Sequence, residues 1–304
     1  MATHTLVANT NSSALTLADG DTIELAGYQL TIDAEPTATG ITVQTPATAG
    51  TVTISGGYDL STWSFTAGTT ILISTVPSGC VVGTVTGGSA NNARGVSTNN
   101  GTVTTATGGS ANGAHGVANN YSTITTATGG SASGAHGVNV NFSSVTTATG
   151  GSASGAHGVA NNYSTITTAT GGSASGTSGV NSNWSTITTA TGGSASTAYG
   201  VNVNFSSVTT ATGGSASTAY GVSVNHSTVL RAYDDVAPAT NEFYGDFKLV
   251  VGPEFRSSFT DTRNTITTIY SIGELSPLAT IPVGVVVITL SEGGTLTIHP
   301  LRYS

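Results

Sequence analysis

A period of 21 residues runs through the middle of the chain and constrains its fold more than any other feature. A Gly-Gly pair recurs at this interval in seven consecutive units, without insertion or deletion. The first glycines of these pairs are Gly87, Gly108, Gly129, Gly150, Gly171, Gly192 and Gly213. Residues 125–138 and 146–159 even share one sequence, TTATGGSASGAHGV. Such a period is typical of repeat proteins, in which each unit packs against a copy of itself.

Three positions of the repeat keep one kind of side chain in every unit. The first column is always valine: Val96, Val117, Val138, Val159, Val180, Val201 and Val222. The second is valine or isoleucine: Val103, Ile124, Val145, Ile166, Ile187, Val208 and Val229. The third is always asparagine: Asn99, Asn120, Asn141, Asn162, Asn183, Asn204 and Asn225. We interpret the first two columns as core ladders and the third as a ladder of stacked side-chain amides.

The composition of the unit favours strands over helices. It is rich in glycine and β-branched residues and lacks apolar residues at helical spacing. We therefore predict an all-β fold, a parallel β-helix (solenoid) with seven 21-residue coils of two or three short strands each. The Gly-Gly pairs and the asparagines are expected at bends with positive φ. Val82 and Val85 lie three residues apart, so both can face the core only if a bend or bulge separates them.

The repeats divide the chain into three parts. Residues 1–80 contain short alternating runs such as DTIELAGYQLTI and are interpreted as an N-terminal β module, either an anchor or the first irregular coils. Residues 81–229 form the predicted repeat shaft. Residues 230–304 break the period and end in VGVVVITLSEGGTLTIHPL, which predicts a hairpin. This last part is expected to be a cap, a trimerisation element or an attachment module.

The charge of the chain is low and unevenly distributed. Charged residues make up 7% of the sequence, and the formal net charge is -8. Residues 1–80 contain acids but no Lys or Arg, and Arg94 is the one charged residue of residues 81–229. The acidic N-terminal part suits a solubilising surface, with a basic partner as the alternative. Without a basic stripe, the sequence predicts no nucleic-acid partner.

The start of the chain and its single cysteine indicate where the protein is made. The sequence MATHTLVANTNS has neither the basic nor the apolar region of a secretory signal peptide, and no apolar run has the roughly 20 residues needed to cross a bilayer. Cys80 is alone, so no intramolecular disulfide is possible. We expect a protein made and folded in the cytoplasm, without membrane insertion.

Catalytic chemistry has no candidate residues in the repeats. Glycoside hydrolysis needs two carboxylates, whereas the repeats contain neither Asp nor Glu. No nucleophile elbow, zinc-binding HExxH or phosphate-binding loop occurs. We therefore predict a protein that is not an enzyme, with no catalytic, cofactor-binding or metal-binding residues.

Two variable columns are the candidates for binding. The first contains His115, His136 and His157 and is continued by Arg94, Ser178, Tyr199 and Tyr220. Stacked imidazoles could bind a transition metal, particularly in a trimer. We interpret this column as a solvent-facing corner. The other contains Asn100, Tyr121, Phe142, Tyr163, Trp184, Phe205 and His226. An exposed aromatic stripe would suit stacking on sugars, whereas a stripe at a subunit interface or a packed corner would serve shape alone.

Threonines flank the second aliphatic column in a Thr-x-Thr pattern, as in Thr123-Ile124-Thr125. Flat threonine arrays on β-solenoids resemble those of ice-binding proteins. The alternative is that threonine simply suits a solvent-facing strand. Ser144 and Ser207 interrupt the array, so ice binding is a lesser alternative.

The repeats, such as TTATGGSASTAYGVNVNFSSV, resemble the β-helical surface proteins of tailed bacteriophage virions in architecture and style, over about half the chain. The resemblance implies a homotrimer on the virion surface, made in the host cytoplasm, with an end module on the particle and a protruding shaft. It implies one of two roles. A capsid cement or decoration spike would bind the major capsid protein. A tail fibre or tailspike would bind a tail protein and host-surface glycan. The acid-free shaft and the short chain favour the decoration spike.

Overall fold

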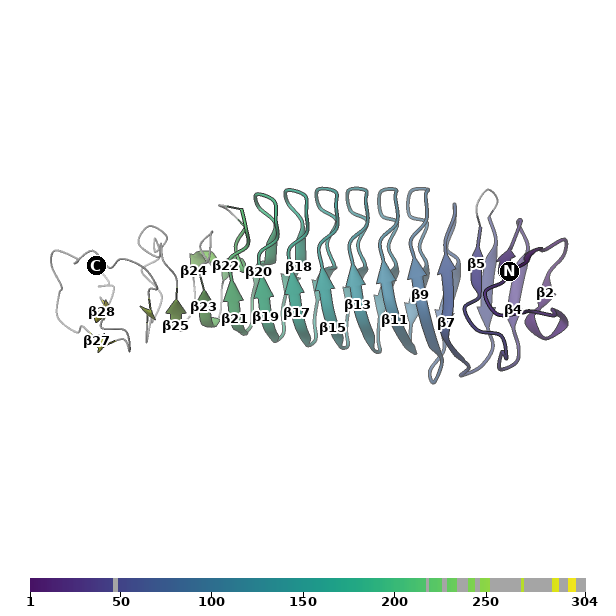
Figure 1. The fold of residues 1–304 in the computed structure, drawn as a ribbon, viewed down its shortest axis with the longest axis horizontal. Helices are drawn as coiled ribbons and strands as arrows, with labels where there is room; N and C mark the ends of the chain where they lie inside the picture. Colours follow the sequence, from purple (N-terminus) through teal and green to yellow (C-terminus); the bar gives the residue numbers. More distant parts are fainter. Residues whose placement is uncertain are drawn as a thin grey trace.

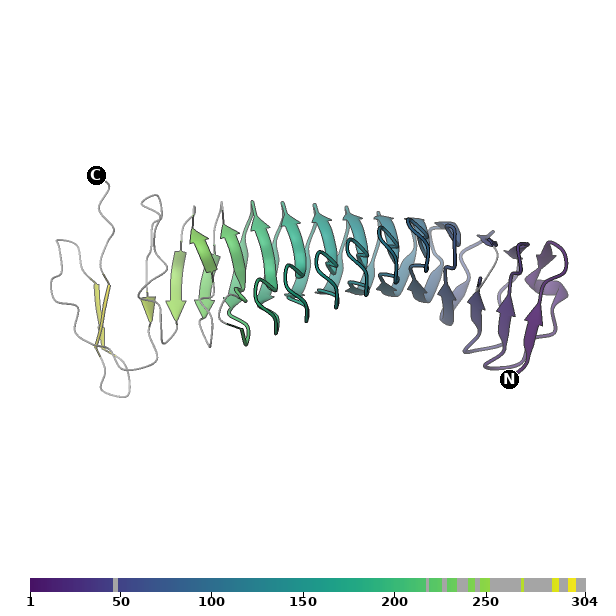
Figure 2. The same cartoon turned by 90° about the horizontal axis from the view of Figure 1, so that it is seen from above.

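The computed structural model shows a rod of stacked β-coils (Figures 1 and 2). It describes residues 1–45, 49–216, 219–225, 229–233, 240–243, 247–251, 269–270, 286–289 and 295–298, with side chains described as far as Ser223. One turn of 3-10 helix, η1 (Ser12–Ala14), is the only helix in this part of the chain. The predicted all-β, parallel solenoid fold is therefore confirmed.

Two parallel sheets form the sides of the rod, and successive strands alternate between them. Sheet A contains, in spatial order, β1 (Thr3–Thr5), β3 (Thr22–Glu24), β5 (Thr42–Gln44), β7 (Asp59–Thr66), β9 (Val81–Thr86), β11 (Thr102–Thr107), β13 (Ile124–Thr128), β15 (Val145–Thr149), β17 (Ile166–Thr170), β19 (Ile187–Thr191), β21 (Val208–Thr212), β23 (Val229–Tyr233), β25 (Phe247–Val251) and β26 (Ile269–Tyr270). Sheet B contains β2 (Thr10–Asn11), β4 (Gln29–Ile32), β6 (Thr51–Ile54), β8 (Ile73–Val76), β10 (Val96–Asn99), β12 (Val117–Asn120), β14 (Val138–Asn141), β16 (Val159–Asn162), β18 (Ser178–Asn183), β20 (Tyr199–Asn204), β22 (Val222–Asn225) and β24 (Thr240–Phe243).

Each repeat makes one coil with a long loop on one edge and a tight turn on the other. Strand β13 of sheet A is followed by the loop 129–137 (GGSASGAHG), strand β14 of sheet B, the turn 142–144 and strand β15. The long loops line one edge of the rod, at the top of Figure 1. The register advances by one repeat per coil, so that Ile124 pairs with Val145 and Val138 with Val159.

The core lies between the two sheets and is narrow. The valine ladder of sheet B is fully buried from Val96 to Val222, and the aliphatic ladder of sheet A is buried from Val103 to Val208. A buried alanine such as Ala127 lies three residues after each aliphatic residue of sheet A. Both can face inward because the paired ladder skips Thr125, where the strand bends. The same bend at Gly83 allows Val82 and Val85 to be buried together, as the sequence required.

The Gly-Gly pairs serve close packing and not positive φ, which corrects the expectation from sequence. Neither glycine of a pair has a positive φ in the described coils. A Cβ on Gly130 would lie 2.2 Å from the carbonyl oxygen of Gly109, and one on Gly129 would lie 2.3 Å from that of Ala156. The left-handed position is instead the glycine in the middle of the loop, such as Gly134 at φ 68. The ladder asparagines are not among the residues with positive φ either.

Residues 1–80 form coils of the same two sheets. Their length varies: the sheet A register runs Thr3, Thr22, Thr42, Ser64 and Thr84, which are steps of 19, 20, 22 and 20 residues. Their core is bulkier than that of the repeats and includes fully buried Trp63 and Phe65. The N-terminal part is therefore a set of irregular first coils continuous with the shaft.

Residues 230–304 are described in part. Strands β24 and β25 extend both sheets beyond the seventh repeat, in parallel pairing with β22 and β23. The predicted hairpin is confirmed by the antiparallel pairing of β27 (Val286–Thr289) with β28 (Thr295–Ile298). The proposed role of this part as cap or trimerisation element depends largely on residues outside the described ranges.

Candidate functional site

The asparagine column forms a continuous side-chain ladder inside the tight turns. From Asn99 to Asn204, each Nδ2 donates to the Oδ1 of the next asparagine at 2.7 Å. The amide also closes its own turn, since Asn141 Nδ2 donates to the Ser143 carbonyl and Asn141 Oδ1 accepts from the Ser143 amide. Both polar atoms of the buried side-chain amide, Oδ1 and Nδ2, are thus hydrogen-bonded twice. Asn225 ends β22, and its side chain lies outside the described residues.

The aromatic column lies directly outside this ladder, on the same edge of the rod. Tyr121, Phe142, Tyr163, Trp184 and Phe205 are 41–53% exposed and form one stack of nearly parallel rings. Neighbouring ring centroids are 4.8–5.5 Å apart, which is the distance between coils. His226, which continues the column in the sequence, lies outside the described residues.

The stacking decides which part of each ring meets the solvent. Because neighbouring rings cover one another's faces, the inner rings of the stack present their edges. Stacking on a sugar uses the face of an aromatic ring. A ligand along this column would therefore contact ring edges, the Tyr hydroxyls and the Trp indole N–H.

The histidines of this column lie in the long loops and are largely covered, which corrects the expectation of a solvent-facing corner. His115 and His157 are buried, at 6% and 9% exposed, and His136 between them is half-buried. The three rings stack with centroids 5.0 and 5.2 Å apart. Each Nδ1 accepts a hydrogen bond from a backbone N–H of the next coil, as between His115 Nδ1 and the His136 amide at 3.3 Å. The rings are therefore neutral, with the proton on Nε2.

Burial lowers the pKa of all three imidazoles. The pKa falls to about 4 for His115, where the Arg94 charge adds to burial, and to about 4 for His157. It falls to about 3 for His136, which also lies between the other two histidines. Where the column changes to Ser178 and Tyr199, the Tyr199 amide donates to the Thr177 carbonyl instead. Strands β18 and β20 accordingly begin two positions earlier than β14 and β16.

This geometry does not suit a shared metal ion. Nearly parallel rings about 5 Å apart keep equivalent nitrogens about as far apart, whereas two ligands at roughly 2.1 Å from one zinc ion are closer together. The Nδ1 atoms are also occupied by backbone amides. Within the described residues, no group of three His, Cys, Asp or Glu side chains could hold a metal.

The coil of β13 has two outward pairs of threonines. Thr123 and Thr125 are exposed on either side of buried Ile124, as the Thr-x-Thr pattern indicated. Thr126 and Thr128, on either side of buried Ala127, form a second, half-buried pair. The sequence signal for this pair was the TTAT run, whose alanine marks the inward position.

A shallow groove runs beside these threonines, between sheet A and the long loops. Near the C-terminal end of the shaft its lining includes Thr170, Gly171, Gly172 and Ser173. Near the N-terminal end it is lined by the equivalent Thr86, Gly87, Gly88 and Ser89, among others. The groove is lined by equivalent residues at both ends of the shaft, and the buried Gly-Gly pairs at its base carry no side chains that would fill it.

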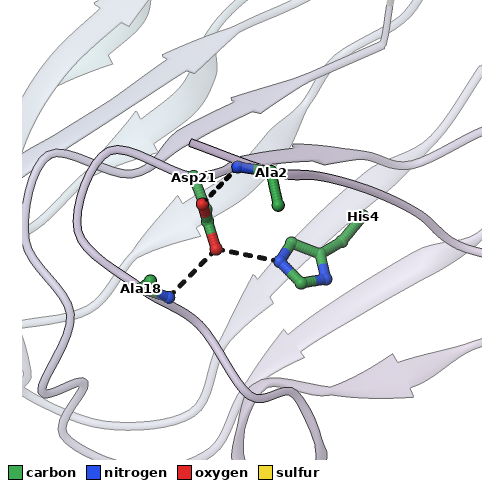
Figure 3. A network of polar contacts seen from close by, with 4 residues as sticks. All are labelled: Ala2, His4, Ala18 and Asp21. Atoms are coloured by element: carbon green, nitrogen blue, oxygen red, sulfur yellow. Dashed lines mark hydrogen bonds and ion pairs between the residues drawn. The ribbon is translucent and has the colours of Figure 1, made fainter.

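Carboxylates hold the irregular first coils together, a role that the sequence analysis missed. Figure 3 shows that Asp21 accepts hydrogen bonds from the Ala2 and Ala18 amides and from the His4 ring. Asp33 accepts bonds from Ser12 and Ser13 in the same way. These bonds hold the pKa of Asp21 well below its usual range, the Ala2 amide contributing most. Most of these bonds span about one coil, and that spacing was the available signal.

Comparison with known proteins gives no relative: no family model, curated protein or solved structure matches this chain. In the part of the chain that the structure describes, no helix is long and apolar enough to span a membrane.

Proposed function

We propose that this chain is a non-enzymatic structural protein whose solenoid serves as the rigid shaft of a spike on a bacteriophage capsid. The observation that carries the proposal is the unbroken stacking of seven equal coils by backbone ladders, with asparagine bonds that link the coils from Asn99 to Asn204. Such a rod extends a structure away from a surface at low conformational cost. The resemblance of the repeats to phage surface proteins is the reason for proposing a phage capsid as the particle.

The proposal includes a homotrimer, with the aromatic column at the contact between copies. Its five rings are the largest continuous set of exposed apolar side chains among the described residues. Their exposed area is on the order of 400 Å², about half of what one partner contributes to a stable interface. The contact would therefore extend to the flanking serines and asparagines.

Immunolabelling of phage lysates in the electron microscope tests the proposal. Label distributed over icosahedral heads supports a decoration spike bound to the major capsid protein, and particles lacking the protein should then lose heat stability. Absence of label from all particles would refute the virion role. Analytical ultracentrifugation of the purified chain tests the trimer separately.

A tail fibre or tailspike adhesin is the second candidate, favoured by the half-exposed aromatic column. In that role the edges of Tyr163 and Trp184 would contact host-surface glycan. Label confined to tail tips, with adsorption to cells reduced by the Y163A/W184A double variant, supports it. The column is instead a subunit contact if the variant dissociates the trimer while virions labelled on their heads adsorb to cells as before.

A further inference from the structure

The outward face of sheet A carries a regular two-dimensional array of hydroxyl groups. Two outward, half-buried threonines occur in each of seven consecutive coils, separated by one buried residue. The pairs are Thr84/Thr86, Thr105/Thr107, Thr126/Thr128, Thr147/Thr149, Thr168/Thr170, Thr189/Thr191 and Thr210/Thr212. We call these fourteen residues the threonine face. Every pair is in register with the next.

The array is periodic in both directions. Equivalent threonines are about 4.8 Å apart along the rod, and the two members of a pair are roughly 6.7 Å apart along the strand. Threonine is β-branched, so its χ1 angle is restricted and its hydroxyl and methyl groups keep similar positions from coil to coil. The face is therefore rigid before anything binds to it.

The hydroxyls of the threonine face have no partner within the described protein. None of the fourteen side chains donates or accepts a hydrogen bond to a protein group, whereas Thr123 contacts Ser144 in the neighbouring turn. No charged side chain belongs to the face, since Arg94 is the one charged residue between Thr84 and Thr212 and lies in a long loop. The natural partner of these hydroxyls is water.

The periodicity limits what kind of partner can use the whole face. A protein surface covering it would remove fourteen hydroxyls from water, at about 1–3 kcal/mol for each one left unpaired. Water arranged in a lattice keeps every hydroxyl bonded and also contacts the methyl groups. Ice is such a lattice, and its planes repeat at distances comparable to those of the array.

We infer that the threonine face binds ice. It holds a layer of water whose spacing follows the coils, and this layer joins the surface of a growing ice crystal. The groove beside the outer threonine column, lined by Gly171, Gly172 and Ser173, offers room for further ordered water. The inference rests on sheet A alone and is independent of the proposed virion role and of the aromatic column.

Thermal hysteresis and inhibition of ice recrystallisation by the purified full-length chain test the inference. The T147Y/T189Y double variant places two bulky side chains on the face, and tyrosine is well tolerated in strands. The matched control, V140Y/S182Y, changes the outward column of sheet B, which already holds Val, Asn and Ser. We expect activity in the wild type, its loss in T147Y/T189Y and its retention in the control.

Absence of hysteresis and of recrystallisation inhibition in the wild type would overturn the inference. It would equally be overturned if T147Y/T189Y kept full activity, or if that variant dissociated an oligomer that the control left intact, because the face would then be a subunit contact. If the tyrosine variant loses the wild-type circular dichroism spectrum, the isosteric T147V/T189V variant takes its place. Loss of activity in that variant supports the inference, and full activity contradicts it.

Discussion

The Nδ2 atom of Asn141 lies 2.7 Å from the Oδ1 atom of Asn162, although 21 residues separate them in sequence. Both side chains are fully buried at the tight turns between the sheets. Each asparagine therefore depends on the coils before and after it. This relationship explains why the repeats keep the residue unchanged: any other side chain would leave two neighbours with unpaired polar atoms.

Replacing one ladder residue should destabilise the shaft strongly. In N162A, Asn141 and Asn183 lose their partner, and the Ser164 carbonyl loses the donor that closes its turn. Each unpaired buried group costs about 1–3 kcal/mol, so we expect a loss of about 3 kcal/mol in the free energy of unfolding. Urea unfolding measures it. The neighbouring N161A variant, at an outward and partly exposed position, should change stability by less than about 0.5 kcal/mol. Equal effects would show that the ladder does not contribute.

The two kinds of loop glycine should respond differently to alanine. In G130A the new Cβ would lie 2.2 Å from the Gly109 carbonyl oxygen, so adjacent coils must separate. We expect a cost of about 3 kcal/mol or more. In G134A the new Cβ would make only an ordinary contact, 3.8 Å from the Gly113 amide nitrogen, and the cost is the left-handed backbone at φ 68, about 1 kcal/mol. Thermal unfolding of both variants compares the two losses of stability. A larger loss in G134A would contradict the packing role of the Gly-Gly pair.

The histidine column should make the protein acid-sensitive in a defined pH range. Its folded pKa values, about 3 to 4, lie below the unfolded value of 6.5, because burial disfavours the charged ring. With the folded pKa below the unfolded one, the neutral histidines stabilise the fold fully above pH 6.5. This stabilisation is lost as the pH falls from 6.5 through the pKa values of the folded state. The loss is about 3 kcal/mol for a histidine whose pKa falls to about 4.

Melting temperatures measured between pH 8 and pH 4 test this expectation. The matched variant is H115S/H136S/H157S, which uses a residue that the column already contains at Ser178. Its stability should change much less over this range, since the remaining carboxylates with lowered pKa titrate below 3.8. An unchanged acid dependence in the variant would mean that the imidazoles are not responsible.

The repeat period was enough to predict the solenoid, because a column of identical residues is also a column in space. Val138 stacks on Val159 and Asn141 on Asn162 for that reason alone. The bend at Thr125 could not be placed from the sequence. It lets Ala127 face the core three residues after Ile124, and so adds the half-buried pair Thr126/Thr128 to the exposed Thr123 and Thr125.

The exposure of the variable columns was harder to predict than the ladders. A column that accepts His, Ser and Tyr suggests solvent, yet His115 is buried against the next coil. The reason is that the loop backbone adapts: its amide bonds either an imidazole or a carbonyl, and the strand lengthens accordingly. The sequence variation at this position therefore reflects two local backbone conformations of the loop and not exposure to solvent.

The N-terminal coil should depend on Asp21. Strand β1 pairs with β3 on one side alone, and the Asp21 carboxylate holds its start through the Ala2 amide and the His4 ring. In D21N one oxygen becomes a donor, and the bonds to backbone amides cannot all be kept. We expect faster hydrogen exchange at the Thr22 amide, which donates to the Ala2 carbonyl, while the repeats exchange as before. The control is D59N, since the Asp59 side chain bonds the nearby Ser61 and no other coil. Equal exchange of residues 1–25 in D21N and D59N would show that the first coil is held by strand pairing and not by this carboxylate.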